Sequence, residues 1–430
     1  MSDLSTDPQA PASAPSAPAA PARRRWRLNS RSPIMITFYA LILGLVVGAL
    51  VIITTTPAVL DSWRGIFHSG TGIFRALKVT WDNVGAAYRS MFNGAVVNPA
   101  NLWHSITTGQ GWEATLTPLS ETLTYATPLI ITSLGVGIAF QTGLFNIGAN
   151  GQAVLGGVTG AVVGSMVHVP MIVHLPLTLV CGFAGGALAG LVPGFLKAYT
   201  GAHEVIVTIM FNYVIYAFLL FSVLSTPFQQ PGQQNDISRT MDSSAQLHPL
   251  FGAASGLRVN YGIVVAALAV AFAWWFLERS SMGFDFRVTG ANPAAAKASG
   301  INAKVVIILV FVISGGLSGL AGVVQVASTT HYIDGGFLIG SAGIGFTAIT
   351  VALLGRNKPG GIVWASLLFA ALGVGGRAMQ GTTGIPLDLA SVIQSAIVLF
   401  VATPVLVKEI FRLRAAPVVK LELATKGWGA

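Results

Sequence analysis

The sequence predicts an all-α, polytopic membrane protein with about ten transmembrane helices, and three observations lead to that fold class. The 430 residues are 53% hydrophobic and only 9% charged, whereas soluble domains carry about 25% charged residues. The apolar runs are long and show no alternation of apolar and polar residues, which argues against an outer-membrane barrel. Residues 122–196 contain no Asp, Glu, Lys or Arg. At about 20 residues per crossing, that stretch holds roughly three membrane helices.

The N-terminal region divides into a tail, a first span and an insert. Residues 1–32 are rich in Ala, Pro and Ser and are expected to form a disordered cytoplasmic tail. The uncharged run 33–60 is long enough to span a membrane, and a cluster of arginines precedes it: Arg23, Arg24, Arg25, Arg27 and Arg31. We interpret residues 61–117, with four tryptophans, as an extracytoplasmic insert that lies at the membrane interface and includes a surface helix at 73–81. A plain connecting loop is the alternative.

Nine further apolar segments complete the transmembrane permease domain, residues 33–410. The second span is expected to begin with Thr117 as its N-cap and Pro118 in its first turn. The third follows a Gly-rich break and ends near residue 168. The others are 172–197, 205–226, 261–277, 305–328, 340–354, 362–379 and 388–407. Residues 411–430 form a basic tail.

The distribution of Lys and Arg predicts the orientation. If the chain crosses the membrane ten times, 17 of its 24 Lys and Arg residues fall in segments on the same side of the membrane. By the positive-inside rule both termini are then cytoplasmic, as is the loop 279–304. Spans two to five and seven to ten run in opposite senses, and each set opens with a helix that leads into a Gly-rich break. This indicates a possible inverted repeat with a solute path between its halves.

The stretch 140–157 places amide side chains inside the uncharged region. Asn146, Asn150 and Gln152 lie there among several glycines. Unpartnered amides are costly in lipid, so we expect a broken helix whose polar groups face protein or a pathway. The alternative is a Gly-rich contact between helices. Asn212, two turns into a later span, likewise needs a partner inside the membrane.

A second pattern lies in the loop 279–304. Asn292 is a helix N-cap, Pro293 occupies the first turn, and Gly300 follows a run of helix-forming residues. A lone helix of this length is marginal in water. It should therefore be held by a partner such as an ATPase subunit, or by packing within its own loop.

Three stretches resemble one known family. The segment GLFNIGANGQ at 143–152 is similar to the GLFNIG-x-x-GQ signature of nucleoside-type ABC transporter permeases, relatives of the ribose and branched-chain amino-acid permeases; the family commonly carries Glu where this chain has Asn150. Residues 201–212 form the second stretch. The third resembles the family's cytoplasmic coupling helix, with matching positions at Arg287, Gly290, Asn292, Pro293, Ala295, Ala296, Gly300 and Ile301.

The resemblance implies a permease subunit of an ABC importer in the inner membrane, with nucleosides as the expected solute. It also implies three partners: a cytoplasmic ATPase, a second permease that forms a heterodimer, and an extracytoplasmic substrate-binding lipoprotein. Simple sugars and branched-chain amino acids are alternative solutes. We expect Asn146, Asn150, Gln152 and Asn212 to line or support the path of a small neutral solute.

The absence of certain motifs from the sequence argues against several other functions. The sequence has no Gly-x-x-x-x-Gly-Lys-Ser/Thr loop, so ATP should be bound and hydrolysed by the partner and not by this chain. We expect no catalytic residues, no cofactor and no metal site. Nucleic acid is not an expected partner, because the basic residues cluster at helix ends. Ionisable groups within the spans are scarce, which favours an externally powered permease over an autonomous secondary transporter. A channel or a structural subunit is a third possibility.

Overall fold

The computed structural model describes residues 33–68, 72–336 and 344–411, and it confirms the all-α prediction. Within those ranges the chain forms helices and isolated bridges but no strand. The N-terminal and C-terminal tails, residues 1–32 and 412–430, lie outside the described residues. The start of the predicted span 340–354 also lies outside them.

Residues 225–261 form a long connection between helices that contains two 3-10 turns, Ser243–Ala245 and Ala253–Ser255, and several isolated bridges. The bounds of the helices are α1 Pro33–Thr55, α2 Pro57–His68, α3 Ile73–Ala95, α4 Pro99–Thr108, α5 Trp112–Gln141, α6 Ala149–Met166, α7 Met171–Thr200, α8 Glu204–Leu224, α9 Gly262–Arg279, α10 Ser281–Ala291, α11 Pro293–Ala298, α12 Ala303–Gln325, α14 Ile344–Leu354, α15 Pro359–Thr383, α16 Asp388–Ala402 and α17 Pro404–Ile410. A π-helical turn, Val326–Thr330, extends α12.

Each of the ten predicted spans corresponds to a helix, but the number that can cross a membrane alone is smaller. Seven of the described helices have the necessary length and hydropathy: α1, α5, α7, α8, α9, α12 and α15. Of the other three, α14 has 11 residues and α16 has 15. At 1.5 Å per residue, α14 covers about half of a 30 Å hydrocarbon core. Glycines and amides lower the hydropathy of α6, although it has 18 residues.

The predicted start of the second span was wrong. α5 begins at Trp112, and Thr117 donates from its hydroxyl to the Glu113 carbonyl at 2.8 Å, inside the helix. The turn that precedes α5 is made earlier, by Gly109 and Gly111, which both have positive φ angles. Glu113 then places a carboxylate in the first turn, where the helix dipole favours negative charge.

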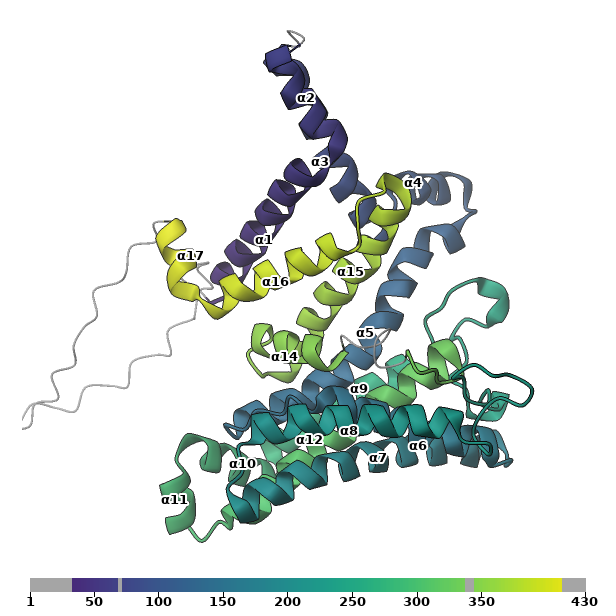
Figure 1. Cartoon of the computed structure of the whole chain (residues 1–430), viewed down its shortest axis with the longest axis vertical. Helices are drawn as coiled ribbons and strands as arrows, with labels where there is room; N and C mark the ends of the chain where they lie inside the picture. Colours follow the sequence, from purple (N-terminus) through teal and green to yellow (C-terminus); the bar gives the residue numbers. More distant parts are fainter. Residues whose placement is uncertain (1–32, 69–71, 337–343, 412–430) are drawn as a thin grey trace, which may run out of the picture.

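The insert is more ordered than the sequence predicted. The expected surface helix at 73–81 continues to residue 95 as α3, and its Ala87 and Met91 pack in one apolar cluster with Leu372 of α15. The opposite face leaves Phe74 and Trp81 exposed. α1 packs against α16 and α3 packs against α15. In Figure 1 α2 extends away from them, and the layer formed by α6, α7, α8 and α12 lies apart.

Glycines bring α6, α7 and α12 into close contact. A Cβ built on Gly156 would lie 2.2 Å from the Cα of Gly319, and one built on Gly319 would lie 2.4 Å from the carbonyl oxygen of Gly182. Small residues of this kind allow membrane helices to approach at backbone distance. The helix-contact interpretation therefore describes the C-terminal part of the 140–157 stretch.

This packing gives a first prediction. Gly319→Ala should lower the thermal midpoint of the detergent-solubilised protein, because the added methyl group meets backbone atoms and overpacking costs about 1–3 kcal/mol. Gly381→Ala in α15 is the matched control, since a Cβ there has no neighbour within 4 Å. That control should keep or slightly raise the midpoint. Equal midpoints for the two variants would contradict the close packing.

Candidate functional site

The predicted break in the 140–157 stretch is confirmed. α5 ends at Gln141 and α6 begins at Ala149. Gly143 takes a φ of 74°, which few other residues tolerate, and it turns the chain out of α5. The amides of Gly143 and Leu144 still donate to carbonyls of the last turn of α5. The segment 142–148 therefore leaves the helix without leaving those donors unpaired.

Asn146 is the centre of the hydrogen bonds that hold this segment. Its side chain is fully buried. Its Nδ2 donates to the Gln152 Oε1 and to the Ser314 Oγ, both at 2.8 Å. Its Oδ1 accepts from the Gly148 amide and from the Gln152 Nε2, both at 3.1 Å. Both donors and both acceptor positions are used, so the cost of burying the amide is offset.

Asn212 makes the corresponding connection to α8. Its Oδ1 accepts from the Gly151 amide at 3.0 Å and its Nδ2 donates to the Ile147 carbonyl at 3.2 Å. The Gly151 amide belongs to the first turn of α6, where backbone donors have no partner within the helix. Asn212 thus has the interior partner that its position requires.

Asn150 lies beside this network but outside it. The residue is buried, and the start of α14 approaches it so closely that a Cβ on Gly345 would lie 2.3 Å from the Asn150 nitrogen. No described residue forms a hydrogen bond with its side chain. The structure thus brings together Asn146, Gln152 and Asn212, and it places Asn150 where two helices begin. Their role along a solute path stays a prediction.

Two cavities lie near these helices, and sequence reasoning missed both. The inner cavity is about 260 Å³ and is lined by residues of α5, α12, α14, α15 and α16. On its wall the Arg377 guanidinium carbon lies 4.0 Å from the centre of the Tyr125 ring. The only available clue was a single arginine in the otherwise uncharged segment 362–379.

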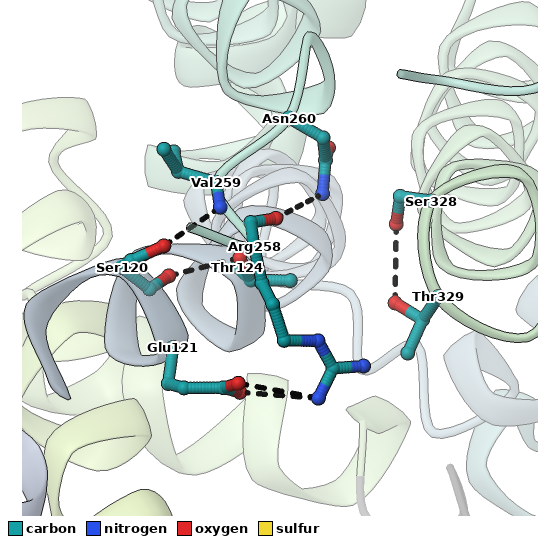
Figure 2. Close-up of polar contacts among 8 residues, drawn as sticks. All are labelled: Ser120, Glu121, Thr124, Arg258, Val259, Asn260, Ser328 and Thr329. Atoms are coloured by element: carbon teal, nitrogen blue, oxygen red, sulfur yellow. Dashed lines mark hydrogen bonds and ion pairs between the residues drawn. The ribbon is translucent and has the colours of Figure 1, made fainter. Parts of the chain in front are cut away.

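The outer cavity, about 330 Å³, lies where the 225–261 connection folds over the end of α12. Arg258 on its wall forms an ion pair with Glu121 of α5 at 3.2 Å, and the Val259 amide donates to the Ser120 hydroxyl at 2.8 Å (Figure 2). His331 also lines it, and burial lowers the pKa of His331 below its usual range. The ion pair and the hydrogen bond fasten the wall of the outer cavity to α5.

The predicted helix in the loop 279–304 is present. As α11 it is capped by Asn292, whose Oδ1 accepts from the Ala294 and Ala295 amides at 3.0 and 3.1 Å. Gly300 follows with a φ of 82°. Only Ala296 is buried; Pro293 and Ala295 are exposed. α11 therefore presents an open face.

A helix that the sequence did not reveal, α10, connects α11 to the break. A Cβ on Gly290 of α10 would lie 2.4 Å from the Gln141 carbonyl oxygen and 2.8 Å from the Thr142 Cα. Arg287 is half-buried, and its Nη1 has no hydrogen-bond partner among the described residues. Gly290 thus brings the loop 279–304 against the residues where α5 breaks.

Comparison with known proteins gives consistent similarities. Residues 119–402 match the family described as branched-chain amino acid transport system / permease component. The guanosine ABC transporter permease protein NupP of Bacillus subtilis is 35% identical over 66% of this chain and 81% of its own length. The nucleoside permease protein NupB of Lactococcus lactis is 34% identical over 72% and 85%. The glucose permease protein TsgB13 of Haloferax volcanii is 32% identical over 66% and 76%. No solved structure matches the chain significantly.

The amide network gives a second prediction. Asn146→Leu should strongly destabilise the protein, because it leaves the Gln152 amide and the Gly148 N–H buried and unpaired at about 1–3 kcal/mol each. Ser314→Ala removes one hydrogen bond and should cost about 1 kcal/mol. Asn83→Leu, at a half-buried residue that bonds only to the Val79 carbonyl of its own helix, is the control. Thermal midpoints in detergent measure all three. A midpoint for Asn146→Leu equal to that of Asn83→Leu would show that the network does not hold the break.

Proposed function

The chain belongs to the family of permease components of branched-chain amino acid transport systems, and on that premise we propose that it carries nucleosides through the inner membrane as one subunit of an ABC importer. It is a translocation subunit and not an enzyme. The family match covers residues 119–402, which includes the break, both cavities and α11.

The observation that carries the choice of solute is similarity to two nucleoside permeases. One relative named for guanosine and one named for nucleosides are 35% and 34% identical to this chain. The polar side chains that line the inner cavity, among them Gln325, Thr347 and Gln394, suit a neutral solute with many hydrogen-bonding groups. A relative named for glucose, at 32% identity, makes a simple sugar the second candidate. A branched-chain amino acid is the third.

We propose that the ATPase subunit docks at α11. Its exposed face, formed by Pro293, Ala294 and Ala295, suits docking in a groove of a cytoplasmic ATPase subunit, which would bind the ATP. Movement of α11 would reach the break through α10, because Gly290 contacts Gln141. Opening of the break to alternate sides would then give alternating access.

The two ends of the helix bundle suggest where the substrate-binding lipoprotein would dock. Figure 1 shows α11 at one end and the 225–261 connection at the other. If α11 is cytoplasmic, the outer cavity faces the extracytoplasmic side, where a substrate-binding lipoprotein would deliver solute. A second permease would complete the path as a heterodimer, and both termini would be cytoplasmic.

Uptake assays test the proposed solute. Cells that lack this gene should lose most uptake of radiolabelled guanosine, adenosine and uridine, and a plasmid copy should restore it. Glucose and leucine uptake should be unchanged. Loss of glucose or leucine uptake with normal nucleoside uptake would overturn the proposal. In liposomes, the purified chain alone should not accumulate nucleoside under a proton or sodium gradient; accumulation there would identify a secondary transporter.

Docking at α11 gives a separate prediction. Ala295→Arg adds a long charged side chain to an exposed face and should weaken ATPase binding about tenfold, equivalent to 1.4 kcal/mol. Ala86→Arg, which adds the same side chain at an exposed residue of α3 outside the family match, is the control. Co-purification of the ATPase with each variant measures the effect. Equal recovery with both variants would show that α11 does not contact the ATPase.

A further inference from the structure

We propose that the inner cavity binds the base of a purine nucleoside that carries an oxo group at position 6, such as guanosine or inosine, and that Arg377 recognises the edge of that base. The inference rests on the proposed nucleoside specificity and adds the binding site and the preferred base.

The inner cavity has the position and lining of a small-molecule site. It lies between α5 of the first helix set and α12, α14, α15 and α16 of the second. Its volume of about 260 Å³ is close to the lower end of the range for small-molecule pockets, about 300–1,000 Å³. A few polar groups converge on an otherwise apolar wall, as such sites require. The polar residues are Tyr125, Gln325, Thr347, Arg377 and Gln394, and the apolar ones include Leu129, Phe369 and Val374.

Arg377 is held in place without a negative partner. Its guanidinium carbon lies 4.0 Å from the Tyr125 ring centre, so the guanidinium group makes a cation–π contact with the face of the ring. No carboxylate among the described residues forms an ion pair with it. The N–H groups around the edge of the guanidinium plane are therefore available to a ligand, and stacking restrains their direction.

The chemistry of this edge selects among bases. Two parallel N–H donors of an arginine match the O6 and N7 acceptors of guanine, and hypoxanthine presents the same pair. Adenine places an amino group at position 6, so donor would face donor. Pyrimidines have no such pair of acceptors on adjacent rings. The planar base is apolar on its faces, which suits a wall that contains Leu129 and Phe369.

The remaining polar groups suit the sugar. Gln394 donates from Nε2 to the Phe369 carbonyl at 3.2 Å, which leaves its oxygen as an acceptor for a hydroxyl group. Gln325 on α12 and Thr347 on α14 supply further donors and acceptors. A ribose carries hydroxyl groups that both donate and accept, so it can pair with such a mixed set.

Competition uptake tests the site in whole cells that carry the complete transporter. With labelled guanosine at a fixed concentration, unlabelled inosine should compete at least fivefold better than adenosine or uridine, since one bidentate contact gives about 1–3 kcal/mol of discrimination, or about 5–150-fold. Arg377→Lys keeps the charge and the aliphatic stem but loses the planar pair of donors. This variant should reduce the preference for inosine over adenosine by at least about fivefold while adenosine uptake continues.

Arg89→Lys is the matched control, because Arg89 is exposed on α3 and lies outside the family match. It should leave the preference for inosine over adenosine unchanged.

If Arg377→Lys keeps the wild-type preference, the inner cavity does not recognise the base, although nucleoside uptake would still support the proposed function. If Arg377→Lys instead abolishes leucine uptake and wild-type cells show no nucleoside uptake, the arginine binds a carboxylate and both proposals fail. If Arg377→Lys does not accumulate in membranes, Gln394→Leu serves in its place and should raise the KM for guanosine uptake; an unchanged guanosine KM would overturn the site.

Discussion

The structure depends on one constraint: a helix break buried among apolar helices must satisfy its polar groups with protein. Asn146 meets that constraint with two donated and two accepted hydrogen bonds, and Asn212 meets it for the first turn of α6. Because these bonds reach Ser314 on α12 and the α8 helix, they also fix where α6 stands relative to both. In the same arrangement, glycines of α6, α7 and α12 approach one another at backbone distance.

The same break is where several parts of the molecule meet. Gly290 brings α10 against the end of α5, and the Gln141 side chain donates to the Asn357 carbonyl in the α14–α15 turn at 2.6 Å. Asn150 at the start of α6 touches Gly345 at the start of α14. A displacement of α10 would therefore act on α5, α6 and α15 together. Packed helices with discrete contacts transmit such a displacement because they do not deform continuously.

Local patterns in the sequence were sufficient for some of these features. The break follows from amides and glycines in an uncharged stretch, and the α11 cap follows from Asn292, Pro293 and Gly300, since capping depends on neighbours a few residues apart. Features set by distant contacts could not be read in this way. Asn146 bonds to a serine 168 positions away, and Arg377 stacks on a tyrosine of another helix. The start of α5 was misplaced because Thr117 and Pro118 fit a helix start as well as a helix interior, and only the preceding glycines decide between them.

The placement of charge argues for a neutral solute. Near the ends of the bundle, Glu204 pairs with Lys197 at 2.7 Å and Glu121 pairs with Arg258 at 3.2 Å. Between these pairs, the residues around the break offer amides and hydroxyl groups that already bond to one another. A cation that entered this region would lose its hydration without gaining an opposite charge, which is costly in a medium of low dielectric constant. A neutral molecule does not carry that cost, because it has no charge to desolvate. The described spans offer few ionisable groups through which transport could couple to an ion gradient, which agrees with the similarity of the chain to ABC transporter permeases.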